Sequence, residues 1–150
     1  MEDKKHISYT LKLLSLRDYF EKELFFKVSK KFNEKSAKEA IKLAKKYGYI
    51  DDDRVANNYI RIKLLSAYGP YYICSKLYEK GYEITVDKVL DIAKTENINI
   101  EEYILKLASN YKNKKSQDPY KMWVKCMTYV TNRGYPIGLC KKLIDIGDFE

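Results

Sequence analysis

Three consecutive aspartates, Asp51, Asp52 and Asp53, form the densest group of side chains in this sequence that could carry out chemistry. Carboxylates grouped in this way can hold a divalent cation or exchange protons with a substrate. Adjacent side chains on one helical turn point in different directions, and no histidine or cysteine lies near them in the sequence. Because carboxylates also cap free amide groups, we interpret the three aspartates as the start of a helix and expect no metal site.

The other reactive residue types form no pattern that indicates catalysis. His6 is the only histidine, and a single histidine beside a chain terminus is more often a surface residue than a general base. Cys74, Cys126 and Cys140 have spacings that fit neither a zinc site nor a redox pair, so we expect them to pack as small apolar side chains. No glycine-rich phosphate-binding loop is present. We therefore expect a binding protein without a cofactor rather than an enzyme.

The composition is typical of a globular cytoplasmic protein. Hydrophobic residues make up 45% of the chain and charged residues 33%. No apolar run is long enough to cross a membrane, and the charged start, MEDKKHISYT, does not resemble a signal peptide. Three widely spaced cysteines are consistent with a reducing compartment. We expect a monomer that does not bind membranes.

Positive charge is concentrated toward the two ends of the chain. The net charge is +8, and residues 1–50 hold 13 Lys/Arg against 7 Asp/Glu. Residues 51–99 hold 7 against 8, and residues 100–150 hold 9 against 6. Such an excess can reflect a nucleic acid or another anionic partner. A sequence rich in Lys, Ile, Asn and Tyr is also what an AT-rich genome produces, so the charge alone does not decide between these origins.

Fifteen tyrosines raise the alternative of stacking on nucleic-acid bases. Most of them recur at the spacing of a helical core, which favours packing. Tyr68, Tyr71 and Tyr72, around Gly69-Pro70, are the least easily explained as core residues.

Helical periodicity extends over most of the chain and predicts an all-α fold. Ala37, Ala40, Ile41 and Ala44 are spaced i, i+3, i+4, i+7, as on one face of a helix, and residues 86–93 repeat this spacing. No alternating pattern of β-strands competes with it.

Capping signals predict where these helices begin and end. Asp18 with Glu21, and Ser36 with Glu39, have the spacing of a capping box and predict two helix starts. Thr85 and Asp118-Pro119 predict two more starts. Gly69-Pro70 is expected to end one helix and begin the next, and Gly48 and Gly81 are expected to follow helix ends.

The same plan recurs along the chain. Residues 80–84 read KGYEI and residues 133–137 read RGYPI, and each precedes a short amphipathic segment. We expect three tandem three-helix repeats, at residues 1–48, 49–97 and 98–150. Because each repeat is too small to bury its apolar face alone, the three should stack into an elongated, curved array.

Several motifs, taken in order, resemble those of the RecX family of regulatory proteins over roughly residues 7–147. The most specific are Gly48-Tyr49-Ile50-Asp51-Asp52 with Val55-Ala56 and Tyr59, then Gly69-Pro70, Ile73, Leu77 and Lys80-Gly81. Further matches are Leu13-Leu14 with Arg17, Glu23-Leu24 with Lys27-Val28, and Arg133-Gly134-Tyr135.

The resemblance implies a protein that lies in the helical groove of the bacterial RecA recombinase filament on DNA and bridges its subunits. Such a protein restrains filament growth, ATP hydrolysis, strand exchange and coprotease activity, and so acts in DNA repair, recombination and the SOS response. Basic residues expected on outer helix faces are the candidate contacts: Arg17, Lys27, Arg61, Lys63, Lys76, Lys80, Arg133, Lys141 and Lys142.

Three alternatives to these contacts and this partner remain open at this point. The same cations could simply be solvated surface charges. The chain could instead be a helical-repeat protein that binds nucleic acid directly, or a scaffold for an unrelated acidic partner.

Overall fold

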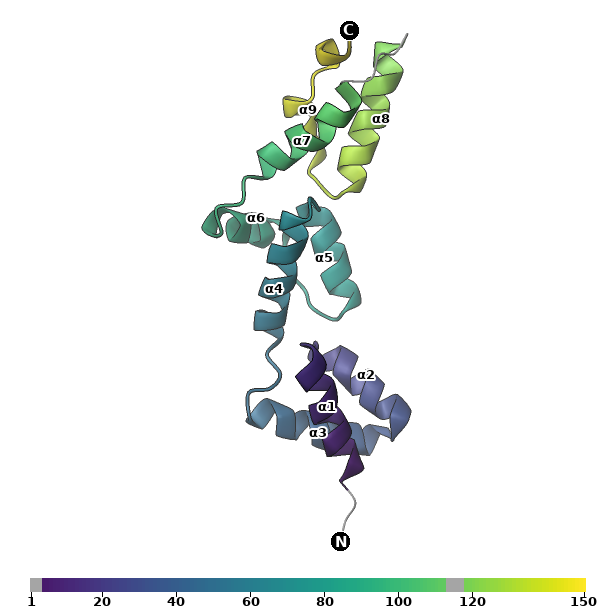
Figure 1. The fold of residues 1–150 in the computed structure, drawn as a ribbon, viewed down its shortest axis with the longest axis vertical. Helices are drawn as coiled ribbons and strands as arrows, with labels where there is room; N and C mark the ends of the chain where they lie inside the picture. The colour runs from purple at the N-terminus through teal and green to yellow at the C-terminus, as the bar shows by residue number, and fades with distance from the viewer. Residues whose placement is uncertain (1–3, 113–117) are drawn as a thin grey trace. The chain divides into compact units, whose positions relative to one another are not determined.

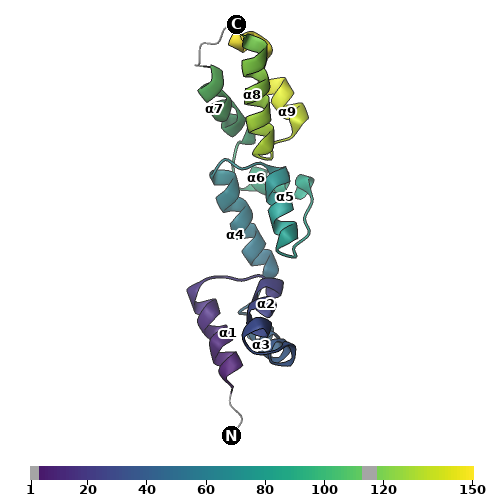
Figure 2. The same cartoon turned by 90° about the vertical axis from the view of Figure 1, so that its right-hand side faces the viewer.

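The computed structural model describes residues 4–112 and 118–150, which form nine α-helices, a final 3₁₀-helix and no β-strand (Figures 1 and 2). The elements are α1 (Lys5–Leu16), α2 (Glu21–Lys31), α3 (Glu34–Lys46), α4 (Asp52–Leu65), α5 (Pro70–Glu79), α6 (Val86–Thr95), α7 (Ile100–Lys112), α8 (Pro119–Asn132), α9 (Ile137–Leu143) and η1 (Ile146–Phe149). The predicted all-α fold is confirmed, and nine helices agree with three repeats of three. In the described ranges, no helix is long and apolar enough to span a membrane.

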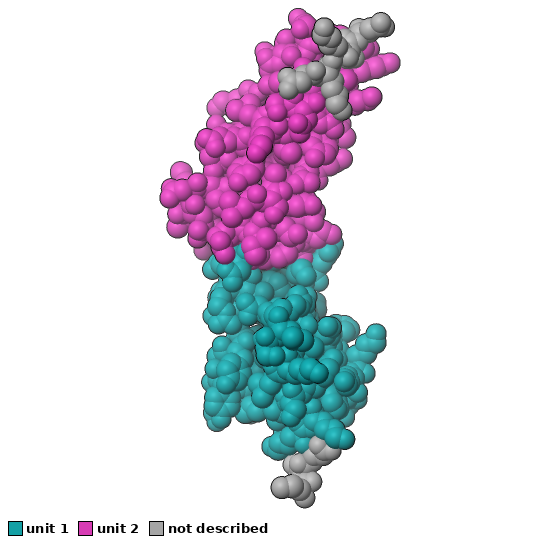
Figure 3. Space-filling view, viewed as in Figure 1, with its two compact units in different colours: residues 1–58, 77–83 teal, residues 59–76, 84–150 magenta. Residues whose placement is uncertain are grey.

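The chain divides into two compact units, coloured separately in Figure 3. Unit 1 comprises residues 1–58 and 77–83, and unit 2 comprises residues 59–76 and 84–150. Helices α4 and α5 therefore each contribute to both units. The boundaries expected at residues 48/49 and 97/98, and the elongated array, remain predictions.

Two of the predicted helix starts are wrong. Helix α2 begins at Glu21, and the backbone N–H of Phe20, not a group of Asp18, donates to Glu23 Oε1 at 3.2 Å. Tyr19 and Phe20 are both buried, and the backbone is still extended at Phe20, so the helix begins only after these two residues. Asp18 instead lies 3.9 Å from the Arg54 guanidinium.

Helix α3 likewise begins before the predicted Ser36. Asn33 is the N-cap, and its Oδ1 accepts a hydrogen bond from the Ser36 backbone N–H at 2.8 Å. An asparagine oxygen satisfies a free amide as well as a serine hydroxyl does, and Asn33 precedes Ser36 in the chain.

The remaining starts are where the sequence predicts them. Thr85 caps α6 by accepting from the Lys88 N–H at 3.2 Å. Asp118 caps α8, in which Pro119 is the first residue, and Pro70 is the first residue of α5. Helix α4 ends at Leu65, four residues before the predicted Gly69.

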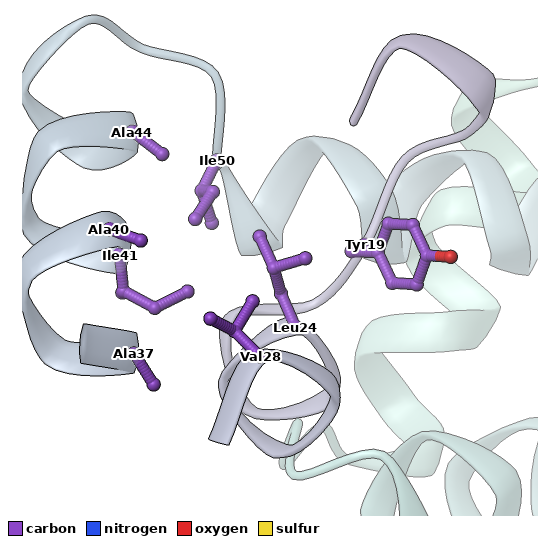
Figure 4. Close-up of a cluster of buried hydrophobic side chains, with 8 residues drawn as sticks. All are labelled: Tyr19, Leu24, Val28, Ala37, Ala40, Ile41, Ala44 and Ile50. Carbon is purple, nitrogen blue, oxygen red and sulfur yellow. The ribbon is translucent and has the colours of Figure 1, made fainter. Parts of the chain in front are cut away.

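The alanine stripe of α3 forms the core of unit 1. Ala37, Ala40, Ile41 and Ala44 are all buried, and Figure 4 shows them facing the side chains of α2. Small side chains allow two helices to approach closely, so the buried aliphatic residues of α2 fill the space beside the stripe. These residues are Leu24 and Val28.

In unit 2, helices α7, α8 and α9 pack against one another (Figures 1 and 2). The indole N–H of Trp123 donates to the Ile144 carbonyl at 2.9 Å and ties α8 to the residue after α9. Cys126 and Cys140 are buried, as predicted, and burial raises the pKa of the Cys140 thiol to about 11. Cys74 is only half-buried.

His6 is not the surface residue that its position in the sequence suggests. It lies in the first turn of α1, and its side chain is only 13% exposed. The ring packs against Phe32, and Nε2 lies 3.4 Å from Glu39 Oε2. The helix begins at Lys5, so the ring faces α3 instead of a frayed terminus.

Candidate functional site

The three aspartates at the start of α4 have three different partners within unit 1. Asp51 Oδ1 accepts from the Arg54 N–H at 3.2 Å, which confirms the interpretation of a helix start. Asp52 Oδ1 accepts from the Glu21 N–H at 2.8 Å and so caps α2, a different helix. Asp53 Oδ1 accepts from the Tyr82 hydroxyl at 2.7 Å. Over residues 4–112 and 118–150, no three His, Cys, Asp or Glu side chains lie where they could share a metal ion.

These aspartates connect α2 and α4 with the turn after α5. In the same region, the Lys80 Nζ atom lies 3.4 Å from Glu23 Oε2, and the Tyr82 ring packs on the Phe20 ring. Burial, with the hydrogen bond to Asp53, raises the pKa of Tyr82 to about 12. We call this group the aspartate contact: Phe20, Glu21, Glu23, Asp52, Asp53, Lys80 and Tyr82.

Three of the nine candidate cations gather around Tyr19 and Glu23 in unit 1. The Arg17 guanidinium carbon lies 3.9 Å from the centre of the Tyr19 ring, and the Lys27 ammonium donates to the Tyr19 hydroxyl at 3.3 Å. Arg17 also lies 3.5 Å from Glu23, the carboxylate that Lys80 contacts. Cation–π contacts and a shared carboxylate hold these side chains in place.

Three more candidate cations surround two stacked tyrosines in unit 2. The rings of Tyr68 and Tyr72 have their centres 4.2 Å apart and planes inclined by 21°. The Arg133 guanidinium carbon lies 3.9 Å from the centre of Tyr68, and the Lys63 ammonium lies 5.3 Å from it. The Lys76 ammonium lies 5.6 Å from the centre of Tyr72. We call these five residues the cation–tyrosine cluster.

Arg133 is held in this cluster by the backbone. Its Nε donates to the Ala67 carbonyl at 2.9 Å and its Nη2 to the Ser66 carbonyl at 2.8 Å. Ala67 has a positive φ of 64°, a conformation that costs an L-residue about 1–2 kcal/mol. The two hydrogen bonds from the guanidinium help to maintain this turn at the end of α4.

Two glycines bring the backbones of residues 66–72 and 133–135 together. The Gly69 N–H donates to the Arg133 carbonyl at 2.7 Å, and the Tyr71 N–H donates to the Gly134 carbonyl at 2.9 Å. A Cβ atom on Gly69 would overlap the backbone of Gly134, and one on Gly134 would overlap Tyr72. We call residues 66–72 and 133–135 the glycine contact.

The last three candidate cations lie on exposed helix surfaces. Arg61 is exposed on α4, two residues before Lys63. Lys141 and Lys142 are exposed in the last turn of α9.

Positive charge alone did not indicate the supporting residues Tyr19 and Glu23. Glu23 belongs to one of the motifs that resemble the RecX family, and its role follows from its position three residues after Phe20, a capping spacing that is not obvious when the first residue is apolar. Cations beside tyrosine rings can receive phosphates or carboxylates, and an accessible ring face can receive a base.

Comparison with known proteins gives one consistent result. The regulatory protein RecX of Clostridium perfringens (strain 13 / Type A) is 34% identical over 130 residues, which are 83% of this chain and 59% of that protein. RecX of Legionella pneumophila (strain Corby) is 27% identical over 140 residues, covering 93% of this chain and 92% of that protein. The crystal structure of RecX from Lactobacillus salivarius matches with a TM-score of 0.77 at 23% identity, over 93% of this chain.

No protein-family model matches the sequence. The chain spans less than two thirds of the length of the Clostridium relative. These relatives are named as regulatory proteins and not as enzymes, in agreement with the expectation of a binding protein.

Proposed function

We propose, because the chain belongs to the RecX family of regulatory proteins, that it binds the RecA recombinase filament on DNA and restrains it. The restrained activities would be ATP hydrolysis, strand exchange and coprotease function. The chain would act in the cytoplasm as a monomer. Family membership is the observation that carries this proposal.

The arrangement of the candidate cations supports two kinds of contact with the filament. Arg17 and Arg133 each lie 3.9 Å from the centre of a tyrosine ring, so they would present fixed cationic and aromatic surfaces. Lys27, Arg61, Lys141 and Lys142 are exposed and would supply attraction to acidic protein surface or phosphate. The side chains of Lys63, Lys76 and Lys80 are partly buried, so their exposure is lower than that of the four exposed cations.

The test is the DNA-dependent ATPase of RecA with increasing amounts of this chain. We expect inhibition at substoichiometric or near-stoichiometric amounts. Reversing two exposed charges with Lys141→Glu and Lys142→Glu should raise the amount needed by about tenfold, because like charges oppose docking. The matched control reverses Lys121 and Lys125, which are exposed on α8 and are not among the candidate contacts. An unchanged ATPase rate at excess protein would refute the proposal.

The cation–tyrosine cluster favours one second candidate, direct binding of single-stranded nucleic acid. Tyrosine rings can stack on bases and neighbouring cations can neutralise phosphates, in a strongly salt-dependent way. Fluorescence anisotropy with labelled single-stranded DNA and no recombinase measures this directly. Salt-dependent binding that Lys63→Glu with Lys76→Glu abolishes, together with an unaffected RecA ATPase, would favour this candidate over the first.

A further inference from the structure

We propose that a groove in unit 1 binds an acidic protein segment that carries a bulky apolar side chain. The groove runs between α1 and α3 and contains a cavity of about 140 Å³ that opens to solvent. It is lined by Ile7, Thr10, Leu11, Ala40, Leu43, Ala44, Tyr47 and Tyr49. None of the nine candidate contact residues is among them, so this surface is additional to the proposed function.

The lining of the groove is apolar and open to solvent. Leu11 is 42% exposed, Tyr47 60% and Tyr49 50%. The two tyrosine rings stand side by side, with centres 6.0 Å apart and planes inclined by 28°. Large apolar side chains that line a hollow and remain exposed are typical of a binding site.

The size of the cavity fits one large side chain. An apolar cavity of about 150 Å³ in another protein holds a benzene ring, so a volume of about 140 Å³ admits a phenylalanine or leucine side chain. Leu11 and Tyr49 also line a neighbouring hollow of about 400 Å³, together with Leu14, Ser15, Asp18, Gly48 and Arg54. The groove therefore continues along α1, which suits a peptide more than a compact small molecule.

The helices that form the walls are strongly basic. Helix α1 carries Lys5 and Lys12 and no acidic residue. Helix α3 carries five lysines against two glutamates: Lys35, Lys38, Lys42, Lys45 and Lys46 against Glu34 and Glu39. The Glu39 carboxylate already lies 3.8 Å from the Lys4 ammonium and 3.4 Å from His6 Nε2, so contacts within unit 1 offset part of its negative charge.

This combination of charge and apolar lining selects a class of partner. The excess of lysines on the two helices that form the groove attracts carboxylates or phosphates. A cavity walled by Ile7, Leu11 and Leu43 favours burial of an aliphatic or aromatic side chain of a protein segment. A nucleic-acid base would leave its polar edges without partners against these aliphatic walls. The occupant is therefore an acidic peptide segment with a central apolar residue.

The experiment measures fluorescence anisotropy of the full chain with a labelled synthetic peptide of Asp and Glu around one central Phe. A second peptide has Ser in place of Phe. Burial of the aromatic side chain removes apolar surface from water, so the Phe peptide should bind at least about tenfold more tightly than the Ser peptide. Binding of both should weaken as salt is raised.

Two variants with the same substitution on the same helix locate the site. Leu11→Glu places a carboxylate in the groove and should weaken binding of the Phe peptide at least about tenfold. Leu16→Glu is the matched control, since Leu16 is 73% exposed on α1 and does not line the groove. Circular dichroism tests whether each variant is folded. If Leu11→Glu does not fold, Tyr49→Ser serves as the groove variant in its place.

Three results would overturn the proposal. The Ser peptide could bind as tightly as the Phe peptide, or Leu16→Glu could weaken binding as much as Leu11→Glu. Sedimentation could instead reveal a dimer that Leu11→Glu dissociates, which would make a second copy of the chain the occupant. The assay contains neither recombinase nor DNA, so its failure would leave the ATPase proposal standing, and the reverse also holds.

Discussion

The aspartate contact of unit 1 and the glycine contact of unit 2 contain related sequences but are built from different atoms. Lys80-Gly81-Tyr82 acts through its side chains, since Lys80 pairs with Glu23 and the Tyr82 hydroxyl donates to Asp53. In Arg133-Gly134-Tyr135 every hydrogen bond across the contact has a backbone partner: the Arg133 and Gly134 carbonyls accept from residues 69 and 71, and the Arg133 guanidinium donates to the Ser66 and Ala67 carbonyls. A repeated motif therefore preserves the shape of a turn without preserving how that turn makes contacts.

This difference determines what each contact is sensitive to. The ion pair of the aspartate contact, Lys80–Glu23, remains accessible to solvent, and ion pairs that water can reach are worth about 0–1 kcal/mol each and are screened by salt. The glycine contact depends on close approach of two backbones, so added volume should affect it more than changes of charge. The substitutions within the two related turn sequences are ordered below from the largest expected effect to the smallest, with control and comparison variants beside them.

Gly134→Ala should cause the largest loss of stability. The added Cβ would overlap Tyr72, and the φ of +100° is unfavourable for any L-residue. Overpacking and the positive φ together should cost about 3 kcal/mol or more. Urea unfolding measures the loss, and hydrogen exchange of the Tyr71 amide, which donates to Gly134, reports it locally.

The control is Gly138→Ala in α9, where an added Cβ meets no atom within 4 Å. Replacing a helical glycine by alanine should be neutral or stabilising, by up to about 1 kcal/mol. Equal destabilisation by the two variants would contradict the account of the glycine contact.

Arg133→Ala should have the next largest effect. It removes two hydrogen bonds to the Ser66 and Ala67 carbonyls as well as the contact with Tyr68. Hydrogen bonds from a charged donor contribute about 1.5–3 kcal/mol, so we expect a loss of about 2 kcal/mol in urea unfolding. Arg133→Lys keeps the charge but not the two-pronged geometry and should recover less than half of it.

Arg17→Ala provides the comparison in unit 1. The Arg17 side chain is 53% exposed and pairs with Glu23, so its loss should cost less than about 1 kcal/mol. If the two arginine variants lose equal stability, the distinction between the two contacts is wrong.

Gly81→Ala tests the same motif position as Gly134→Ala. Gly81 also has a positive φ, of 86°, but its added Cβ would meet only the Lys22 side chain, at 2.6 Å from Cδ. A lysine side chain can move aside, so the cost should be about 1–2 kcal/mol, from the backbone conformation alone. Urea unfolding of the two variants in parallel measures the difference, and a larger loss for Gly81→Ala would reverse the comparison.

The sequence predicts local structure better than it predicts these contacts. The stripe of residues 37–44 has only one helical face that can be buried, so periodicity is enough to place it in the core. The predicted start of α2 at Asp18 is wrong because burial of Tyr19 and Phe20 overrides a capping pattern that is favourable in isolation.

The candidate site is predictable only in part. Tyr68, Tyr71 and Tyr72 stand out around Gly69-Pro70 in the sequence. The structure places Lys63, Lys76 and Arg133 around Tyr68 and Tyr72, whereas Tyr71 is exposed. The hydrogen bond from Arg133 to Ala67 joins residues 66 apart in the sequence. Charge and periodicity carry no information about such a pairing. The hydrogen bonds from Arg133 to backbone carbonyls could therefore be found only in the structure.

Of the substitutions within the two related turn sequences, Tyr82→Phe should have the smallest effect and the most specific pH dependence. The substitution removes only the hydroxyl that donates to Asp53, so the free energy of unfolding near neutral pH should fall by about 0.5–1.5 kcal/mol. The pKa of Tyr82 is raised from 10 to about 12 by burial and by Asp53, so folding favours the neutral phenol. Its contribution to stability is therefore fully present below pH 10 and is lost as the pH rises toward 12.

The wild-type chain should accordingly lose its advantage over Tyr82→Phe across that interval. Tyrosinate absorbance of the wild type minus that of the variant isolates the titration of Tyr82 from the other fourteen tyrosines. Its midpoint should lie near 12 and fall in Asp53→Asn, which removes a negative charge beside the phenol, while burial, the larger cause, still holds it above 10. A midpoint near 10 in the wild type would show that neither burial nor Asp53 raises the pKa of Tyr82, and the aspartate contact would then rest on Asp52 and the Lys80–Glu23 pair.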